Sequence, residues 1–208
     1  MAYERKDAYW RRAKQEGYRS RAAYKLLELQ RRFEVIRKGH KVLDLGCAPG
    51  GWLQVISEAV GPHGRVVGVD RDPVSTVGLR PNVSVLRGDA SDPEVLARAK
   101  ASIGGPVDVV TSDMAPHLSG VGFRDHARSC EIVRLVLRLC RQCLVPGGTL
   151  LAKVFEGEDL DALEQEVESV FREVRRVVPR ASRKASSEVY LLARGYCPQA
   201  LGGGDDTP

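Results

Sequence analysis

A chain of 208 residues, 43% hydrophobic and 28% charged, has room for one domain with a full core and not for two of similar size. No stretch reaches the length of a membrane span, and the first ten residues are charged where a signal peptide would be apolar. We therefore expect an intracellular, cytoplasmic protein that binds no membrane. An odd number of cysteines, five, favours reduced thiols over a disulfide framework.

The positive charge is concentrated at the beginning of the chain. Residues 1–41 contain thirteen basic and five acidic residues, a net charge of +8 against +5 for the whole chain. The aromatic residues among them are Tyr3, Tyr9, Trp10, Tyr18 and Tyr24. Basic side chains neutralise phosphates and aromatic rings stack on unpaired bases, so residues 1–40 are predicted to be an RNA-binding arm and helix. A solvated basic helix without a partner is the alternative.

Helices and strands are predicted to alternate along the chain. Ser20 is placed to cap a first helix, which has Lys25 near its buried edge and which Gly39 ends. The expected strands are 41–45, 65–70, 83–87, 107–111, 149–154, 172–178 and 189–193. The further helices expected are 51–60, 92–101, 125–144 and 159–170, with a turn at 146–148.

This order predicts an α/β fold with a doubly wound, mainly parallel seven-stranded sheet flanked by helices, over residues 41–196. Two consecutive strands at the end predict a C-terminal antiparallel hairpin. Residues 197–208 are expected to form a disordered tail. Cys140 and Cys143 have a C-x-x-C spacing, but they fall on one face of an amphipathic helix and no second pair of ligands accompanies them, so we interpret them as core residues and expect no metal.

A glycine loop follows the first predicted strand, with the sequence Asp44-Leu45-Gly46-Cys47-Ala48-Pro49-Gly50-Gly51-Trp52. It lets backbone approach a ligand closely, and it lacks the G-x-G-x-x-G dinucleotide fingerprint. The next three strands end in Asp70, Asp89 and Asp113. A carboxylate at Asp70 can accept both hydroxyl hydrogens of a ribose, and Asp89 is placed to contact an adenine edge. Helix caps are the alternative, which suits Asp92 and Asp125 better. The pattern therefore predicts a cofactor in the crevice at the switch point of the sheet.

Five stretches in this order resemble the RrmJ/FtsJ family of RNA ribose 2′-O-methyltransferases. They are Y-R-S-R-A-A-Y-K-L-L-E-L around Lys25, V-L-D-L-G-C-A-P-G-G-W, T-S-D-M-A-P-H around Asp113, L-L-A-K-V-F-E-G around Lys153 and S-S-E-V-Y-L-L-A around Glu188. The resemblance extends from about Tyr18 to about Gly195. It implies a Rossmann-like methyltransferase fold that uses S-adenosylmethionine.

The family's binding positions for S-adenosylmethionine fall on Gly50, Trp52, Asp70, Asp89 and Asp113. Its catalytic positions fall on Lys25, Asp113, Lys153 and Glu188, with Lys153 as the proton acceptor. Two residues depart from the pattern. Cys47 replaces the usual Ala with another small residue, and His117 stands where relatives have Asn. His117 has no assigned catalytic role: it is a hydrogen-bonding residue behind the site, a residue that faces RNA, or a partly exposed loop histidine.

Methyl transfer to an alcohol needs an aligned oxygen and a group that deals with its proton. Lys153 interrupts an otherwise apolar strand, which makes it the hardest of the four to explain as a structural residue. As a base it must be partly uncharged, which Lys25 would favour while Asp113 and Glu188 oppose it. A charged Lys153 that steers the oxygen is the alternative. Lys25 as surface decoration of a helix and Glu188 as the start of an edge strand are the structural interpretations of those two.

The expected reaction is methylation of a ribose 2′-hydroxyl in RNA, most specifically a uridine of large-subunit ribosomal RNA, by a monomer. Further basic residues expected to hold the RNA backbone are Arg172, Arg175, Arg176, Arg180, Arg183 and Lys184. The alternatives are a methyltransferase acting on transfer RNA or a small molecule, a nucleotide-linked dehydrogenase, and a non-catalytic RNA-binding assembly module with a vestigial pocket. The missing fingerprint weakens the dehydrogenase, and the presence of all four catalytic-type residues weakens the vestigial module.

Overall fold

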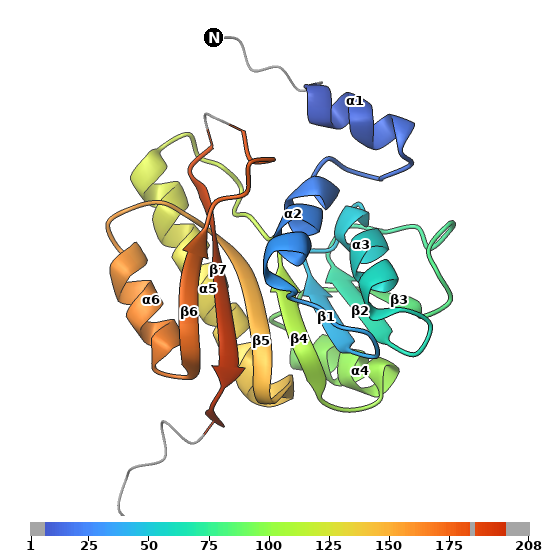
Figure 1. The fold of residues 1–208 in the computed structure, drawn as a ribbon. Helices are drawn as coiled ribbons and strands as arrows, with labels where there is room; N and C mark the ends of the chain where they lie inside the picture. Colours follow the sequence, from blue (N-terminus) through green and yellow to red (C-terminus); the bar gives the residue numbers. More distant parts are fainter. Residues whose placement is uncertain (1–6, 184–185, 199–208) are drawn as a thin grey trace, which may run out of the picture.

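The computed structural model describes residues 7–183 and 186–198 and shows one seven-stranded sheet with helices on both faces (Figure 1). The strands are β1 (Lys41–Leu45), β2 (Arg65–Asp70), β3 (Val83–Arg87), β4 (Val107–Ser112), β5 (Leu144–Phe155), β6 (Phe171–Val177) and β7 (Glu188–Tyr196). The helices are α1 (Ala8–Gln15), α2 (Ala23–Phe33), α3 (Gly51–Val60), α4 (Pro93–Ile103), α5 (Gly122–Cys143) and α6 (Leu160–Glu168). Tyr3, Lys184 and residues 199–208 of the expected tail lie outside the described residues.

The sheet has the strand order β3-β2-β1-β4-β5-β7-β6. The five strands from β3 to β5 pair in parallel, and β7 lies antiparallel between β5 and β6. The predicted mainly parallel sheet with a C-terminal antiparallel hairpin is therefore confirmed. Because β2 and β4 lie on opposite sides of β1, the chain changes direction across the sheet at this point. A crevice at the carboxyl ends of β1 and β4 is the usual ligand site of such a sheet.

Helices α2 and α3 cover one face of the sheet, and α4, α5 and α6 cover the other (Figure 1). Each layer buries an apolar stripe of its helices against branched residues of the strands. Cys140 and Cys143 belong to the stripe of α5, where burial raises the pKa of the Cys143 thiol to about 11. The interpretation of these two cysteines as core residues is confirmed. Among the described residues, no helix combines the length and apolar character that crossing a membrane requires.

Several element boundaries differ from the prediction. Ser20 does not cap a helix: α2 begins at Ala23, its N-cap is Ala22, and no side chain caps it, because residues 20–22 form a separate turn. Helix α5 begins at Gly122, three residues before the expected start. Residues 146–148, predicted as a turn, lie at a shift of register within β5, since Val107 pairs with Leu144 and Val109 with Thr149. Glu188 does begin a strand, but β7 lies between two others and is not an edge strand.

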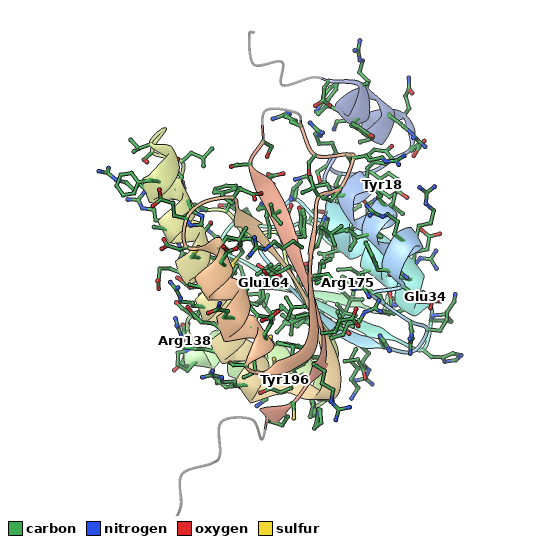
Figure 2. All side chains as sticks on the ribbon, turned by 60° about the vertical axis from the view of Figure 1, so that its left-hand side comes forward. Tyr18, Glu34, Arg138, Glu164, Arg175 and Tyr196 are labelled. Carbon is green, nitrogen blue, oxygen red and sulfur yellow. The ribbon has the colours of Figure 1, made fainter. Side chains whose placement is uncertain are left out.

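The N-terminal segment packs onto the body of the protein. Asp7 caps α1 by accepting a hydrogen bond from the backbone N–H of Trp10 at 2.9 Å. The ring centroids of Tyr9 and Tyr18 each lie 5.6 Å from that of Tyr24, and Figure 2 shows Tyr18 below α1, where the chain enters α2. Tyr24 is buried in this cluster, so the expectation that its ring is available to stack on RNA bases is wrong.

Candidate active site

Two lysine–carboxylate pairs meet at the carboxyl end of the sheet. Lys25 Nζ on α2 lies 2.5 Å from Glu188 Oε2 at the start of β7. Lys153 Nζ on β5 lies 3.0 Å from Asp113 Oδ1 and donates a hydrogen bond to the backbone oxygen of Asp113 at 2.6 Å. The structure therefore brings together the four residues predicted as the catalytic set, although they are separated by up to 163 positions in sequence. Their catalytic roles remain a prediction.

Asp113 is the electrostatic centre of this group. Burial of its carboxyl opposes ionisation and is the largest single influence, but the charges of Lys153 and Lys25 and a hydrogen bond from Tyr190 hold its pKa below the ordinary value. A carboxyl with a lowered pKa stabilises the fold above the unfolded pKa, and this contribution disappears as the pH falls through the folded value. Asp113 is therefore ionised at neutral pH, and each lysine has its own carboxylate partner.

Tyr190 is a member of this group that the sequence analysis missed. Its hydroxyl donates a hydrogen bond to Asp113 Oδ1 at 2.7 Å, and its ring stacks on Trp52 with 5.8 Å between centroids. Burial raises the pKa of Tyr190 well above its usual range, so the phenol keeps its proton. Alternate residues of a strand share a face, so the spacing of two between Glu188 and Tyr190 was a usable signal.

Removal of the Tyr190 hydroxyl is expected to weaken this group of residues, while the aromatic ring stays packed in the core. Tyr190→Phe should lower the free energy of unfolding by about 1.5 kcal/mol, because the lost hydrogen bond goes to a charged acceptor in a buried position. Tyr196→Phe is the matched control, since Tyr196 is also buried and no hydrogen bond of its hydroxyl occurs among the described residues. Urea denaturation of both variants measures the difference. Equal losses in the two variants would contradict the assigned role of the Tyr190 hydroxyl.

The glycine loop has the backbone that its sequence predicted. Gly46 adopts φ 74°, and a Cβ at this position would come within 2.4 Å of the Met114 side chain. Gly50 adopts φ 105° immediately before α3. Both positions therefore require glycine, and the loop leaves its backbone open to a ligand.

Arg19, which lies in the N-terminal segment, holds the residues around this loop in place. Its guanidinium donates hydrogen bonds to three carbonyl oxygens: Pro49 at 3.3 Å, Ser75 at 2.5 Å and Val77 at 2.5 Å. The Trp52 side chain also points into the protein, and its indole N–H donates to the carbonyl of Ala22 at 2.9 Å. Trp52 can thus approach a ligand in the loop with its backbone. The two contacts tie the N-terminal segment and α2 to the predicted cofactor site.

The predicted carboxylates line the same end of the sheet. Asp70 Oδ2 accepts a hydrogen bond from the backbone N–H of Ala48 at 2.8 Å, which joins β2 to the glycine loop. Asp89 accepts hydrogen bonds from the backbone and hydroxyl of Ser91 and pairs with Arg71. The Ser91 contacts, with help from Arg71, hold the pKa of Asp89 below its ordinary value. Both side chains are partly exposed, so acceptor positions remain on their carboxyl groups for the hydroxyl and amino groups of a nucleoside.

Asp44 is a second polar residue that the sequence analysis did not single out. It is 1% exposed at the end of β1, Thr111 donates a hydrogen bond to its Oδ1 at 2.7 Å, and its Oδ2 has no hydrogen-bond partner among the described residues. Burial raises the pKa of Asp44 to about 8. A buried carboxyl oxygen without a partner, beside a glycine cradle and two carboxylates, fits a site that holds a polar ligand such as S-adenosylmethionine.

The raised pKa of Asp44 predicts a specific pH dependence. Between about pH 4 and pH 8 the folded protein keeps a proton that the unfolded chain has lost, so stability falls as the pH rises through this range. Asp44→Asn has no such proton. The stability of Asp44→Asn relative to wild type should therefore increase by about 3 kcal/mol between pH 5.5 and pH 8.5, measured by urea denaturation without cofactor. The exposed Asp72→Asn is the control, and a pH-independent difference for Asp44→Asn would contradict the assignment.

The basic residues predicted to bind RNA divide into two groups. Arg21 contacts Asp7 and the carbonyl of Ala181, and Arg176 pairs with Asp161 and Glu164 on α6, so these guanidinium groups have partners within the protein. Arg11, Lys14, Arg31 and Arg180 are exposed. His117 lies exposed on the loop after β4, which agrees with its interpretation as a loop histidine.

Comparison with solved structures defines the class of protein. A ribosomal RNA methyltransferase described from Plasmodium falciparum superposes with a TM-score of 0.77 at 29% identity, covering 86% of this chain and 98% of that one. Fibrillarin from Aeropyrum pernix, solved with S-adenosyl-L-methionine, shares the fold with a TM-score of 0.58 at 24% identity, covering 85% and 75% of the two chains. The fold is that of the Rossmann-like, S-adenosylmethionine-dependent methyltransferases, as predicted.

The sequence comparisons identify the family. The profile of the FtsJ-like methyltransferases matches residues 18–196. Ribosomal RNA large subunit methyltransferase E of Methanothrix thermoacetophila is 45% identical over 194 residues, which are 93% of this chain and 74% of the relative. The protein of the same name from Methanothermobacter thermautotrophicus is 44% identical over 196 residues, covering 94% of this chain and 92% of that relative. The chain belongs to the FtsJ-like methyltransferase family.

Proposed function

We propose that this protein transfers a methyl group from S-adenosylmethionine to the 2′-hydroxyl of a ribose in RNA, most specifically a uridine of large-subunit ribosomal RNA. The observation that carries the proposal is the pair of lysine–carboxylate contacts beside the glycine loop, Lys25 with Glu188 and Lys153 with Asp113. The relatives named ribosomal RNA large subunit methyltransferase E support RNA as the substrate. The protein acts as a monomer in the cytoplasm and uses no metal.

The cofactor would be held by the backbone of Gly50 and Trp52 and by the carboxylates of Asp70, Asp89 and Asp113. When bound, S-adenosylmethionine supplies a methyl group already activated by a positively charged sulfur. The protein therefore needs to add no further activation of the donor. Its task is to align the attacking oxygen and to deal with the proton of the hydroxyl.

Lys153 is placed for this task. The Nζ of Lys153 contacts Asp113 in two directions, through the backbone oxygen and through the carboxylate of Asp113. A third direction remains for the ribose 2′-oxygen. In our proposal Lys153 would first release a proton to solvent, and its neutral amine would then accept the proton of the 2′-hydroxyl when the oxygen takes the methyl group and the donor sulfur leaves as a neutral thioether. Asp113, held by Tyr190, fixes the position of the amine. The pair of Lys25 and Glu188 holds the ribose from the other side through its charged and acceptor groups.

Exposed basic residues at this end of the molecule supply contacts to the RNA backbone. Figure 1 shows α1 at the top of the view, close to the loop that joins β6 to β7. Arg11 and Lys14 on α1 are exposed, and so is Arg180 on the loop. A backbone that follows these cations would bring a nucleotide to the site from the side of α1.

The proposal is tested by methyl transfer from labelled S-adenosylmethionine to unmodified ribosomal RNA and to large subunits that lack the modification. Digestion to nucleosides and mass spectrometry identify the methylated atom. Label on the 2′-oxygen of uridine is the expected result. Label on a base, or no transfer to any RNA by a protein that binds S-adenosylmethionine, would overturn the proposed function and favour a small-molecule enzyme or a vestigial module.

A further inference from the structure

A cavity of about 550 Å³ opens beside the pair of Lys25 and Glu188. Ala22, Ala115, Leu118 and Phe155 give it mainly apolar walls, and Asp125, Ser186 and Ser187 add polar groups. Its size falls within the range of about 300–1,000 Å³ that is typical of sites for small organic ligands. Most of these residues have no role in the proposed reaction.

The outer wall of the cavity is formed by an unusually apolar surface segment. Among the described residues, five large hydrophobic side chains are exposed, and three of them lie within residues 118–123. Leu118 is 70% exposed, Val121 43% and Phe123 75%. Leu118 and Gly122 of this segment line the cavity together with Lys25 and Glu188, so this part of the segment lies next to the proposed reaction centre.

The segment is held in a fixed shape. Asp125 Oδ1 accepts hydrogen bonds from the backbone N–H and the hydroxyl of Ser119 at 2.8 Å and 2.7 Å, and Oδ2 accepts one from the N–H of Gly120 at 3.2 Å. The Ser119 contacts in particular hold the pKa of Asp125 below its ordinary value, so these hydrogen bonds persist at neutral pH. Leu118 is thus exposed on a turn that hydrogen bonds hold in place, and it forms part of the apolar lining of the cavity.

Two arginines lie at the mouth of the cavity. Arg21 and Arg183 line it, and both contact the carboxylate of Asp7. The two arginines also join α1, α2 and the loop after β6, because Arg21 donates to the carbonyl of Ala181. An apolar cavity with arginines at its entrance matches a nucleotide, in which an aromatic base is linked to a phosphate.

We infer that this cavity binds the base of the nucleotide that is methylated, extruded from its neighbours, with Leu118 as one wall and with Arg21 and Arg183 on the adjoining phosphate. The inference rests on the proposed function, which places the target ribose between Lys153 and the pair of Lys25 and Glu188. The base is attached to that ribose and needs a site within one nucleotide's length of it. Unpaired bases that leave their stack and enter an apolar pocket are a general mode of RNA recognition.

The first test compares Leu118→Asp with Val178→Asp. Val178 is 57% exposed and does not line the cavity, so the control introduces the same charge at another exposed apolar position. Leu118→Asp should raise KM for the RNA by about tenfold or more, because it removes an apolar wall and repels phosphate. The affinity for S-adenosylmethionine should be unchanged in both variants. Equal KM values for the two variants would overturn the inference.

The second test removes the base and keeps the ribose. The RNA that wild type methylates is prepared by ligation with a hydrogen in place of the target base, and a second RNA has this change at the neighbouring nucleotide. Wild type should lose about tenfold or more in kcat/KM with the first RNA. Leu118→Asp, which has already lost the contact, should lose less than about threefold further.

Each outcome of these tests is informative. If removal of the base and Leu118→Asp lower kcat/KM independently of each other, the inference is overturned. A larger coupling between Leu118 and the neighbouring base would also overturn it, because it would place a different base in the cavity. No transfer to any RNA by wild type would overturn the proposed function, and the base site with it. Methyl transfer by the wild-type protein without these couplings would overturn only the inference that the cavity binds the base.

Discussion

Replacement of Lys153 by methionine is expected to lower kcat for RNA methylation by about 10²- to 10⁴-fold, the range typical of a lost general base. Methionine keeps the length of the buried stem on β5 and removes the nitrogen that would meet the 2′-oxygen. Binding of S-adenosylmethionine should persist, because the glycine loop and the carboxylates of Asp70 and Asp89 are untouched. Lys38→Met, at an exposed position, is the control. Calorimetry of cofactor binding and single-turnover methyl transfer separate the two effects.

Lys153→Arg then distinguishes proton acceptance from electrostatic steering. An arginine keeps the positive charge but cannot be deprotonated in a protein. In our proposal Lys153→Arg should therefore be nearly as inactive as Lys153→Met. An arginine variant that retains a large part of the activity would show that the charge alone suffices. An active Lys153→Met would remove Lys153 from the mechanism altogether.

The sequence predicted the order of elements because their boundaries depend on local signals. Apolar runs that end in glycine or aspartate marked each strand of the parallel sheet, and Asp92 caps α4 as its position suggested. The strand order was not part of the prediction and comes from the structure. Boundaries failed where tertiary contacts decide them: β7 is flanked on both sides and extends to Tyr196, beyond its apolar run.

The residues of the site were predicted only where the sequence itself contains a local signal. Lys153 stands out in sequence because a lysine in an apolar strand is rare, whereas Tyr190 in a strand looks like an ordinary core residue. Arg19 looks like an RNA-binding cation, but its guanidinium donates to carbonyl groups that lie up to 58 positions away in sequence. Such contacts leave no local pattern in the sequence. The hydrogen bond from Tyr190 to Asp113 and the inward role of Arg19 therefore required the three-dimensional arrangement.

Loss of the Asp113 carboxylate is expected to have the largest effect on stability. The side chains of Lys153 and Asp113 are 7% and 17% exposed, so Asp113→Ala leaves a buried ammonium group without its counter-charge. Breaking a buried pair from one side typically costs about 3–5 kcal/mol. Asp161→Ala is the matched control: Asp161 is 83% exposed in its contact with Arg176, and such surface pairs contribute less than about 1 kcal/mol.

The double variant Asp113→Ala, Lys153→Met shows where the energy of the pair resides. If the loss in Asp113→Ala comes from the uncompensated lysine, removal of the lysine should restore about half or more of the lost stability, although methyl transfer stays abolished. Additive losses would instead mean that each side chain stabilises the fold through separate contacts, such as the hydrogen bond of Asp113 to Tyr190. Recovery in the double variant would show that the pair adds little net stability to the sheet, since an apolar pair of similar volume can stabilise it equally well, and this is the result expected of a pair whose role lies in the proposed reaction.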